Sequence, residues 1–158
     1  MKVFVSGGAG VIGRELVSRL LARGDSITVG DLKERPKDWP CDIVYIECDL
    51  NYLARDIECD VFYHLAATFE RLAESLDHWS ENFHNNVYLS HQLLRHVKAK
   101  RVVFASSYLV DPQPRNLTGA AKLYTENELE FLWKHRALNS VSARIYRSYG
   151  CGSRDVIS

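Results

Sequence analysis

Three glycines near the N-terminus have the spacing of a phosphate-binding loop. Gly7, Gly10 and Gly13 follow the apolar run Val3-Phe4-Val5, which is typical of a buried strand. A strand must end and a helix begin here within a few residues, and a phosphate must approach the free N–H groups of the helix N-terminus. Gly7 supplies the tight turn, Gly10 leaves room for a pyrophosphate, and Gly13 lets the helix pack closely on the strand. The spacing therefore predicts a dinucleotide-binding loop.

An acidic residue follows at the distance expected for a ribose ligand. Asp31 ends the apolar segment 26–30, about 20 residues after the glycine loop, where a carboxylate hydrogen-bonds the ribose hydroxyls. Such a carboxylate would repel a 2′-phosphate, so we expect NAD to be preferred over NADP, although Lys33 and Arg35 could partly offset the repulsion. The alternative for Asp31 is an exposed turn residue, which the glycine loop makes the weaker interpretation.

The elements that must position these residues alternate between apolar strand patterns and helical patterns, which indicates parallel βαβ units. We expect strands near 2–6, 26–30, 43–46, 60–65, 101–106 and 140–145. We expect helices at about 11–23, 50–57, 78–98 and 118–136. Right-handed crossovers then predict an α/β, Rossmann-type doubly wound parallel sheet in the order 3-2-1-4-5-6, with helices on both faces and the ligand at the carboxyl edge.

Composition narrows the class of protein further. The chain has 158 residues, 46% of them hydrophobic, and its 20 basic and 20 acidic residues cancel. Residues 1–158 are long enough for one domain with a substantial core, and no basic stripe suggests nucleic acid or an anionic membrane as a partner. No apolar run approaches the roughly 20 residues that a membrane-spanning helix needs. The four cysteines form no C-x-x-C pair, and the N-terminus lacks a signal-peptide pattern, so a cytoplasmic protein is expected.

The glycine spacing also resembles a known superfamily. Gly7-x-x-Gly10-x-x-Gly13 is similar to the loop of the short-chain dehydrogenases/reductases, and the string Gly-Gly-Ala-Gly-Val-Ile-Gly at 7–13 resembles their extended branch, the NAD-dependent nucleotide-sugar epimerases and dehydratases. The resemblance implies that Asp49, with Leu50 after it, holds the adenine ring. It also assigns to the cofactor site the neighbouring residues Val11, Ile12 and Leu32.

The fourth expected strand strengthens this resemblance. Asp60-Val61-Phe62-Tyr63-His64-Leu65-Ala66-Ala67 is similar to the family's D-x-V-x-H-L-A-A, in which Leu65, Ala66 and Ala67 would border the cofactor. His64 could be catalytic, but a histidine inside a buried parallel strand is more often a satisfied core residue. Asn86 matches the family's Asn-Val motif and would tie the strand-four backbone to the active-site loop.

The chemistry implied by the resemblance is incomplete. Ser107 aligns with the family's catalytic hydroxyl, and Lys122 with the lysine of its Y-x-x-x-K pair, where residues four apart share one helix face and the ammonium lowers the phenol pKa. The resemblance also assigns Lys122 to the cofactor site, where it would hydrogen-bond the nicotinamide ribose. Thr118 stands at the tyrosine position, and an aliphatic hydroxyl cannot serve as that acid–base group. Tyr124 fails as a substitute because Glu128 lies four residues after it. Tyr108, next to Ser107, remains an alternative.

The sixth expected strand departs from the family pattern as well. Tyr146 would border the cofactor, but Arg147 replaces the family's Asn and Cys151 its Pro. The family normally runs longer than this chain, so we expect the C-terminal lobe that holds the nucleotide-sugar to be missing. The sixth strand would then be an open edge, which predicts self-association as a homodimer.

Three hypotheses follow from these residues. The first is the NAD-binding domain of a nucleotide-sugar epimerase or dehydratase, whose parent reaction transiently oxidises a sugar hydroxyl by hydride transfer to NAD. The second is a non-catalytic NAD-binding module, because Thr118 replaces the tyrosine. The third is an atypical reductase that transfers protons through Ser107, water or substrate. A metal site is not expected, because the histidines at 78, 84, 91 and 96 are scattered around their helix.

Overall fold

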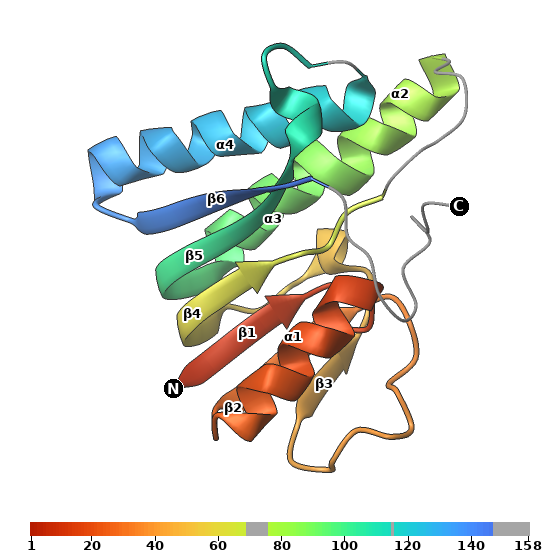
Figure 1. Ribbon diagram of the computed structural model, residues 1–158, viewed down its shortest axis with the longest axis vertical. Coiled ribbons are helices and arrows are strands. Elements are labelled where there is room, and N and C mark those ends of the chain that lie inside the picture. The colour runs from red at the N-terminus through yellow and green to blue at the C-terminus, as the bar shows by residue number, and fades with distance from the viewer. Residues whose placement is uncertain (69–75, 115, 147–158) are drawn as a thin grey trace.

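A six-stranded parallel sheet forms the centre of the molecule (Figure 1), as seen in a computed structural model that describes residues 1–68, 76–114 and 116–146. The strand order is β3-β2-β1-β4-β5-β6, which confirms the expected doubly wound topology. The strands are β1 (Lys2–Ser6), β2 (Ser26–Asp31), β3 (Val44–Glu47), β4 (Ile57–His64), β5 (Val97–Ser107) and β6 (Asn139–Ile145). The order reverses between β1 and β4, where such sheets bind their ligands.

Helices cover both faces of this sheet. They are α1 (Val11–Ala22), α2 (Leu76–Asn82), α3 (Leu89–His96) and α4 (Leu117–Arg136), with a π-helix η2 (Phe83–Tyr88) between α2 and α3. Two short 3₁₀ helices, η1 (Leu50–Tyr52) and η3 (Tyr108–Val110), follow β3 and β5. No helix in the described ranges is long and apolar enough to cross a bilayer.

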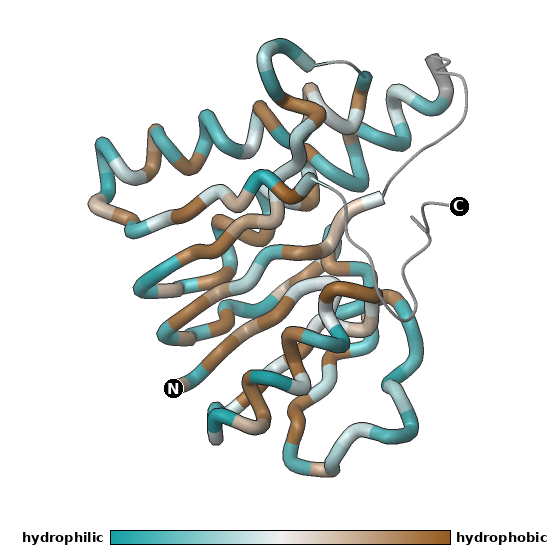
Figure 2. The backbone as a smooth tube through the Cα atoms, viewed as in Figure 1, coloured by the Kyte–Doolittle hydropathy of each residue, from teal (hydrophilic) through white to brown (hydrophobic). Residues whose placement is uncertain are grey.

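The two faces of the sheet carry separate cores because side chains alternate along each strand. On one face, Val3 and Val5 of β1 pack with Val17 and Leu20 of α1. On the opposite face, Phe4 stacks on Phe62 at 5.3 Å, within a core that α3 and α4 complete. Figure 2 shows the corresponding hydrophobic runs along β1 and β4. β6, in contrast, is an edge strand whose residues are mostly exposed.

Two of the expected helices were wrong in extent. The helix expected at 50–57 is only the turn η1, because Ile57 already pairs with Val97 in the ladder between β4 and β5. The same pairing ends the helix expected at 78–98 at His96, since β5 starts at Val97. The first residues of β5 are largely polar, so their sequence does not display the alternation that marks a strand.

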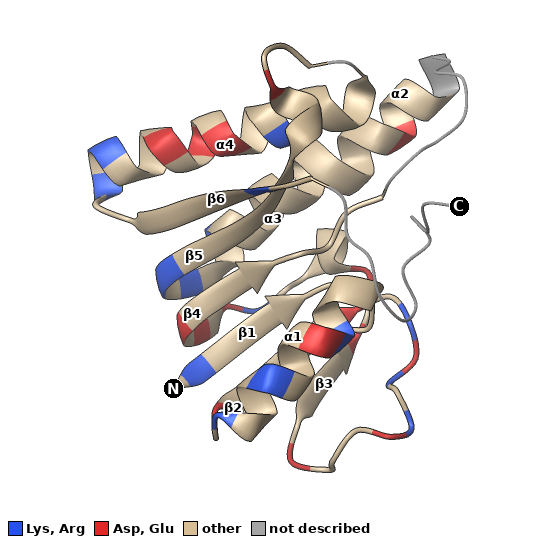
Figure 3. Ribbon diagram, in the orientation of Figure 1, with Lys and Arg blue, Asp and Glu red and all other residues tan. Residues whose placement is uncertain are grey.

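Charges of both signs are spread over the outer surfaces. Figure 3 shows both signs of charge along α1, and on α4 it shows acidic residues in the middle of the helix with basic residues toward its two ends. Several of them pair, as in Arg19 with Glu15 on α1 and Lys134 with Glu130 on α4. Neither helix therefore offers a block of a single charge to a polyanion.

Candidate nucleotide site

The glycine loop between β1 and α1 is closely packed against its surroundings. Gly7 has a φ of +74°, and a Cβ there would lie 2.7 Å from the Ala66 nitrogen, after β4. A Cβ on Gly13 would lie 2.4 Å from the Gly7 oxygen, so the first turn of α1 rests on the loop itself. Only glycine meets both requirements without a backbone shift.

Gly10 differs from the other two glycines because the space beside it is open. A Cβ on Gly10 would meet only the Gly7 oxygen, at 3.2 Å, and Gly10 lines a cavity. Gly10 is also the N-cap of α1 and supplies no side-chain cap. The first N–H groups of α1 have no acceptor within the helix, which is the arrangement that favours an anion at a helix N-terminus.

The carboxylate of Asp31 holds the glycine loop in place. Its Oδ2 accepts a hydrogen bond from the Ala9 N–H at 2.9 Å, and its Oδ1 accepts one from the Lys33 N–H at 3.0 Å. Asp31 is 8% exposed and lies in the cavity wall at the end of β2. This anchoring role is not predictable from the sequence, because a contact across 22 residues has no local signal.

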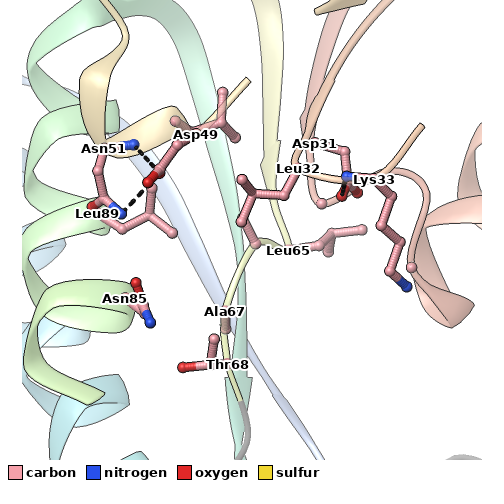
Figure 4. Close-up of a pocket in the computed structure, with 14 residues that line it drawn as sticks. Asp31, Leu32, Lys33, Asp49, Asn51, Leu65, Ala67, Thr68, Asn85 and Leu89 are labelled. Atoms are coloured by element: carbon pink, nitrogen blue, oxygen red, sulfur yellow. Dashed lines mark hydrogen bonds between the residues drawn. The ribbon is translucent and has the colours of Figure 1, made fainter. Parts of the chain in front are cut away.

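The cavity, about 230 Å³ in volume, lies at the carboxyl edge of β1, β2, β3 and β4 (Figure 4). Nine residues that the sequence analysis assigned to the cofactor line it together: Gly7, Gly10, Asp31, Leu32, Asp49, Leu50, Leu65, Ala66 and Ala67. Lys33, expected only as a cation near the ribose, lines the cavity as well, and four lining residues were missed: Asn51, Thr68, Asn85 and Leu89. The volume is below the roughly 300–1,000 Å³ of typical small-molecule sites, so the cavity suits one half of a dinucleotide.

Asp49 and Asn51 form the wall of the cavity that lies opposite Asp31. Asp49 Oδ1 accepts hydrogen bonds from the Asn51 N–H at 2.9 Å and from its Nδ2 at 3.0 Å, as Figure 4 shows. Asn51 Oδ1 is buried and has no hydrogen-bond partner among the described residues. A buried acceptor without a donor is costly, so Asn51 is held in this wall by the hydrogen bonds that it gives to Asp49.

Six other residues assigned to the cofactor lie outside the cavity wall: Val11, Ile12, Gly13, Asn86, Lys122 and Tyr146. Asn86 is buried, and its side chain bonds both the N–H and the carbonyl of Thr68, at 2.9 and 3.1 Å, so it ties down the segment after β4. Its neighbour Asn85 takes the place in the wall. Tyr146 is 70% exposed and stacks on Tyr108, with ring centroids 5.6 Å apart. Arg147 and Cys151 lie outside the described residues.

The polar groups at the expected catalytic positions are bonded to other parts of the protein. Ser107 Oγ accepts the Leu109 N–H at 3.2 Å and so caps η3. Thr118 is 4% exposed, and its Oγ1 accepts a hydrogen bond from Asn82 Nδ2 at 3.4 Å. Lys122 Nζ donates to the Ala105 carbonyl at 2.8 Å. None of the three bonds another, so the structure does not connect them into a proton-transfer chain.

The amine of Lys122 is buried beside an aromatic ring. Lys122 Nζ lies 4.7 Å from the centroid of the Phe104 ring, and burial lowers the Lys122 pKa from 10.5 to about 8.

Within residues 1–68, 76–114 and 116–146, no three His, Cys, Asp or Glu side chains are grouped as metal ligands would be.

Strand order, glycine loop and the acid at the end of β2 together define the Rossmann-type class of dinucleotide-binding folds. Within this class the chain belongs to the NAD dependent epimerase/dehydratase family, whose sequence model matches residues 3–157. An uncharacterized protein of Mycobacterium tuberculosis is 40% identical over 50 residues, which are 32% of this chain and 6% of that protein.

Solved structures resemble nearly the whole chain. UDP-glucuronic acid 4-epimerase from Bacillus cereus, in complex with UDP-glucuronic acid and NAD, is 26% identical with a TM-score of 0.79, over 95% of this chain and 58% of its own. MoeE5 in complex with UDP-glucose and NAD is 28% identical with a TM-score of 0.78, over 98% of this chain and 57% of its own. This chain therefore spans little more than half the length of these proteins.

The buried ammonium of Lys122 predicts a specific pH dependence of stability. Between about pH 8 and 10.5 the unfolded chain binds a proton at Lys122 that the folded chain has released, so the free energy of unfolding should rise with pH. Relative to Lys122→Met, the wild type should gain about 3 kcal/mol across this window. Urea unfolding of both proteins at several pH values measures the difference. Parallel curves for the two proteins would contradict the burial of a charged amine.

Proposed function

We propose that this chain binds NAD, with the adenosine half in the cavity between Asp31 and Asp49. The observation that carries the proposal is the cavity wall itself, in which Gly10, Asp31 and Asp49 meet from three different segments. The family membership and the NAD complexes of similar proteins support it. The NAD-binding role of each residue below is part of this proposal.

Each end of the cavity offers a different chemistry to the dinucleotide. The open backbone at Gly10 and the N-terminus of α1 would receive the pyrophosphate, because the N–H groups and the helix dipole favour negative charge there. The Asp31 carboxylate already accepts two N–H groups and would use further lone pairs for the ribose hydroxyls. Asp49 Oδ2 accepts no hydrogen bond within the described residues, so it can accept one from the adenine amino group.

Preference for NAD over NADP follows from the charges beside Asp31. A 2′-phosphate would approach a carboxylate that cannot move away without releasing the Ala9 and Lys33 N–H groups. Arg14 cannot readily offset this repulsion, because Asp38 accepts two hydrogen bonds from its guanidinium, at 2.7 and 2.9 Å. Lys33 remains as a partly compensating cation in the cavity wall.

The parent reaction is proposed as the transient oxidation of a sugar hydroxyl in a nucleotide-sugar. NAD, when bound, accepts the hydride in such a reaction. The similar proteins with bound UDP-glucuronic acid or UDP-glucose support this substrate class. The activity belongs to a complete family member, since this chain spans 57–58% of the length of those proteins.

A second candidate function is a non-catalytic NAD-binding module. The observation that favours it is the state of Thr118, which is buried and bonded to Asn82 where the family places its catalytic tyrosine. Ser107, the proton carrier of the atypical-reductase alternative, already accepts the Leu109 N–H. Cofactor binding is therefore proposed for this chain in both candidates, and they differ in whether a proton can leave the sugar.

The cofactor proposal predicts different effects of two similar glycine substitutions. Gly10→Ala adds a methyl group to the open side of the loop and should cost about 1 kcal/mol of stability or less, but weaken NAD binding at least about tenfold. Gly13→Ala brings a methyl group against the Gly7 oxygen and should destabilise the fold itself. Calorimetric titration with NAD and urea unfolding measure the two effects. Full NAD affinity in Gly10→Ala would remove the pyrophosphate from this loop.

The two candidate functions predict different responses to substrate. The wild-type chain, saturated with NAD and mixed with UDP-glucose or UDP-galactose, should form no NADH and no epimer, because Thr118 cannot accept the proton. Absorbance of NADH and chromatography of the sugars measure this. Turnover by the wild type would overturn the non-catalytic candidate. In the complete protein, turnover gained in Thr118→Tyr would identify a lapsed enzyme, whereas silence in that variant would favour the module.

A further inference from the structure

The imidazole of His64 is enclosed at the end of β4. His64 is 1% exposed, and its ring lies 5.5 Å from the ring of Phe62 and 5.2 Å from that of Phe104. Ser6 of β1 is its partner in the sheet register. This enclosure fixes the plane of the ring, so the directions of its two nitrogens are fixed as well.

Both ring nitrogens of His64 are hydrogen-bonded to serine hydroxyls. Nδ1 lies 2.9 Å from Ser6 Oγ, and Nε2 lies 2.8 Å from Ser90 Oγ. Ser90 Oγ in turn donates its proton to the Asn86 carbonyl at 2.6 Å, four residues earlier in the π-helix η2 that leads into α3. Because a serine hydroxyl has one proton, Ser90 must accept from His64, which places the imidazole proton on Nε2.

The same reasoning fixes the other side of the ring. With the proton on Nε2, Nδ1 is an acceptor, so the Ser6 hydroxyl donates to it. Ser6 Oγ can then accept the Ala66 N–H, which lies 3.4 Å away. The result is a chain with one direction, from the Ala66 N–H through Ser6, His64 and Ser90 to the Asn86 carbonyl. We call these five groups the His64 relay.

Both ends of the His64 relay hold the same segment of the cavity wall, residues 65–68. At one end, Ser6 accepts the Leu65 N–H on its carbonyl at 3.0 Å and the Ala66 N–H on its hydroxyl. At the other end, the Asn86 side chain bonds the Thr68 backbone on both its N–H and its carbonyl. Ala66 also packs directly against Gly7 of the glycine loop. The relay therefore connects Ser6, which holds Leu65 and Ala66, to Asn86, which holds Thr68.

We propose that His64 is a positioning residue of the nucleotide cavity: as a neutral imidazole protonated at Nε2, it couples Ser6 to Ser90 and so holds residues 65–68 against the glycine loop. That the cavity binds a nucleotide rests on the function proposed above, whereas the coupling through His64 does not. His64 acts through its neighbours and is not exposed to the cavity, so it is not an acid or base of the reaction.

The electrostatics of the site support a neutral imidazole. Burial, and to a smaller extent the charge of Lys122, lower the His64 pKa from 6.5 to about 3. A protonated ring would present a donor to Ser6, whose hydroxyl would then lose its acceptor. Long-range ¹H–¹⁵N NMR correlation should show Nε2 protonated and Nδ1 unprotonated from pH 8 down to pH 5. The opposite tautomer would overturn the relay.

The first experiment tests coupling across the imidazole without any cofactor. Ser90→Ala should speed amide hydrogen exchange at Ala66, on the far side of the ring, by about three- to tenfold relative to the Phe62 amide. Ser6→Ala should likewise speed exchange at Thr68. Thr125→Val is the matched control, because the buried Thr125 hydroxyl also donates to a carbonyl four residues earlier but lies outside the relay. Effects confined to the neighbourhood of each substitution would overturn the coupling.

The second experiment tests whether the relay positions the cofactor cavity. Ser6→Ala and Ser90→Ala should each weaken NAD binding about three- to tenfold. The double variant should bind NAD no more weakly than the weaker-binding single variant, because both substitutions break the same hydrogen-bonded chain. In a His64→Phe background, neither serine substitution should have a further effect. Losses that multiply would contradict a shared path through His64.

The two experiments separate this inference from the proposed function. If the wild type binds no NAD, the proposed function fails, and the exchange measurements still decide whether the relay exists. If exchange is coupled but NAD affinity stays unchanged in the serine variants, the relay exists and its role in the cavity is overturned.

Discussion

The carboxylate of Asp31 is the interaction on which the geometry of the cavity depends. It accepts N–H groups from Ala9, in the glycine loop, and from Lys33, in the turn after β2. These bonds hold the loop where Gly7 can pack on Ala66 and where Gly13, in the first turn of α1, can pack on Gly7. A buried carboxylate needs such donors, and the loop N–H groups need acceptors, so each stabilises the other.

The two halves of the carboxyl edge differ in whether their polar groups are already bonded within the protein. Around β1, β2 and β3, open space and unused acceptors remain at Gly10, Asp49 and Asn51. Around β5 and α4, the hydroxyl and amine groups are used inside the protein: Ser107 caps η3, and Lys122 binds the Ala105 carbonyl. The structure is therefore better prepared to receive a ligand beside Asp31 than to transfer a proton beside Thr118.

The sheet order followed from the alternation of patterns along the sequence, because right-handed crossovers and a glycine-rich first turn leave few topologies. The start of β5 was not predictable in this way, since its polar residues are ordered by pairing with β4 and not by burial.

The cavity wall was predictable where a residue ends a strand or comes within two residues of its end, as at Asp31, Asp49 and Ala66. Asn51 was missed because its place depends on a side-chain bond to Asp49, and Asn85 because the π-helix η2 sets which face of the helix it occupies. The His64 relay was not predictable either, since it joins hydroxyls 58 and 26 residues from the histidine.

The most direct test of this account is the ratio of NAD to NADP affinity in the wild type and in Asp31→Ala, measured by calorimetry. A ratio removes effects that loosening the loop has on both dinucleotides alike. We expect the wild type to bind NAD at least about tenfold more tightly than NADP, and the substitution to weaken NAD more than NADP. An unchanged ratio, or a wild type that binds neither dinucleotide, would contradict the placement of the ribose beside Asp31.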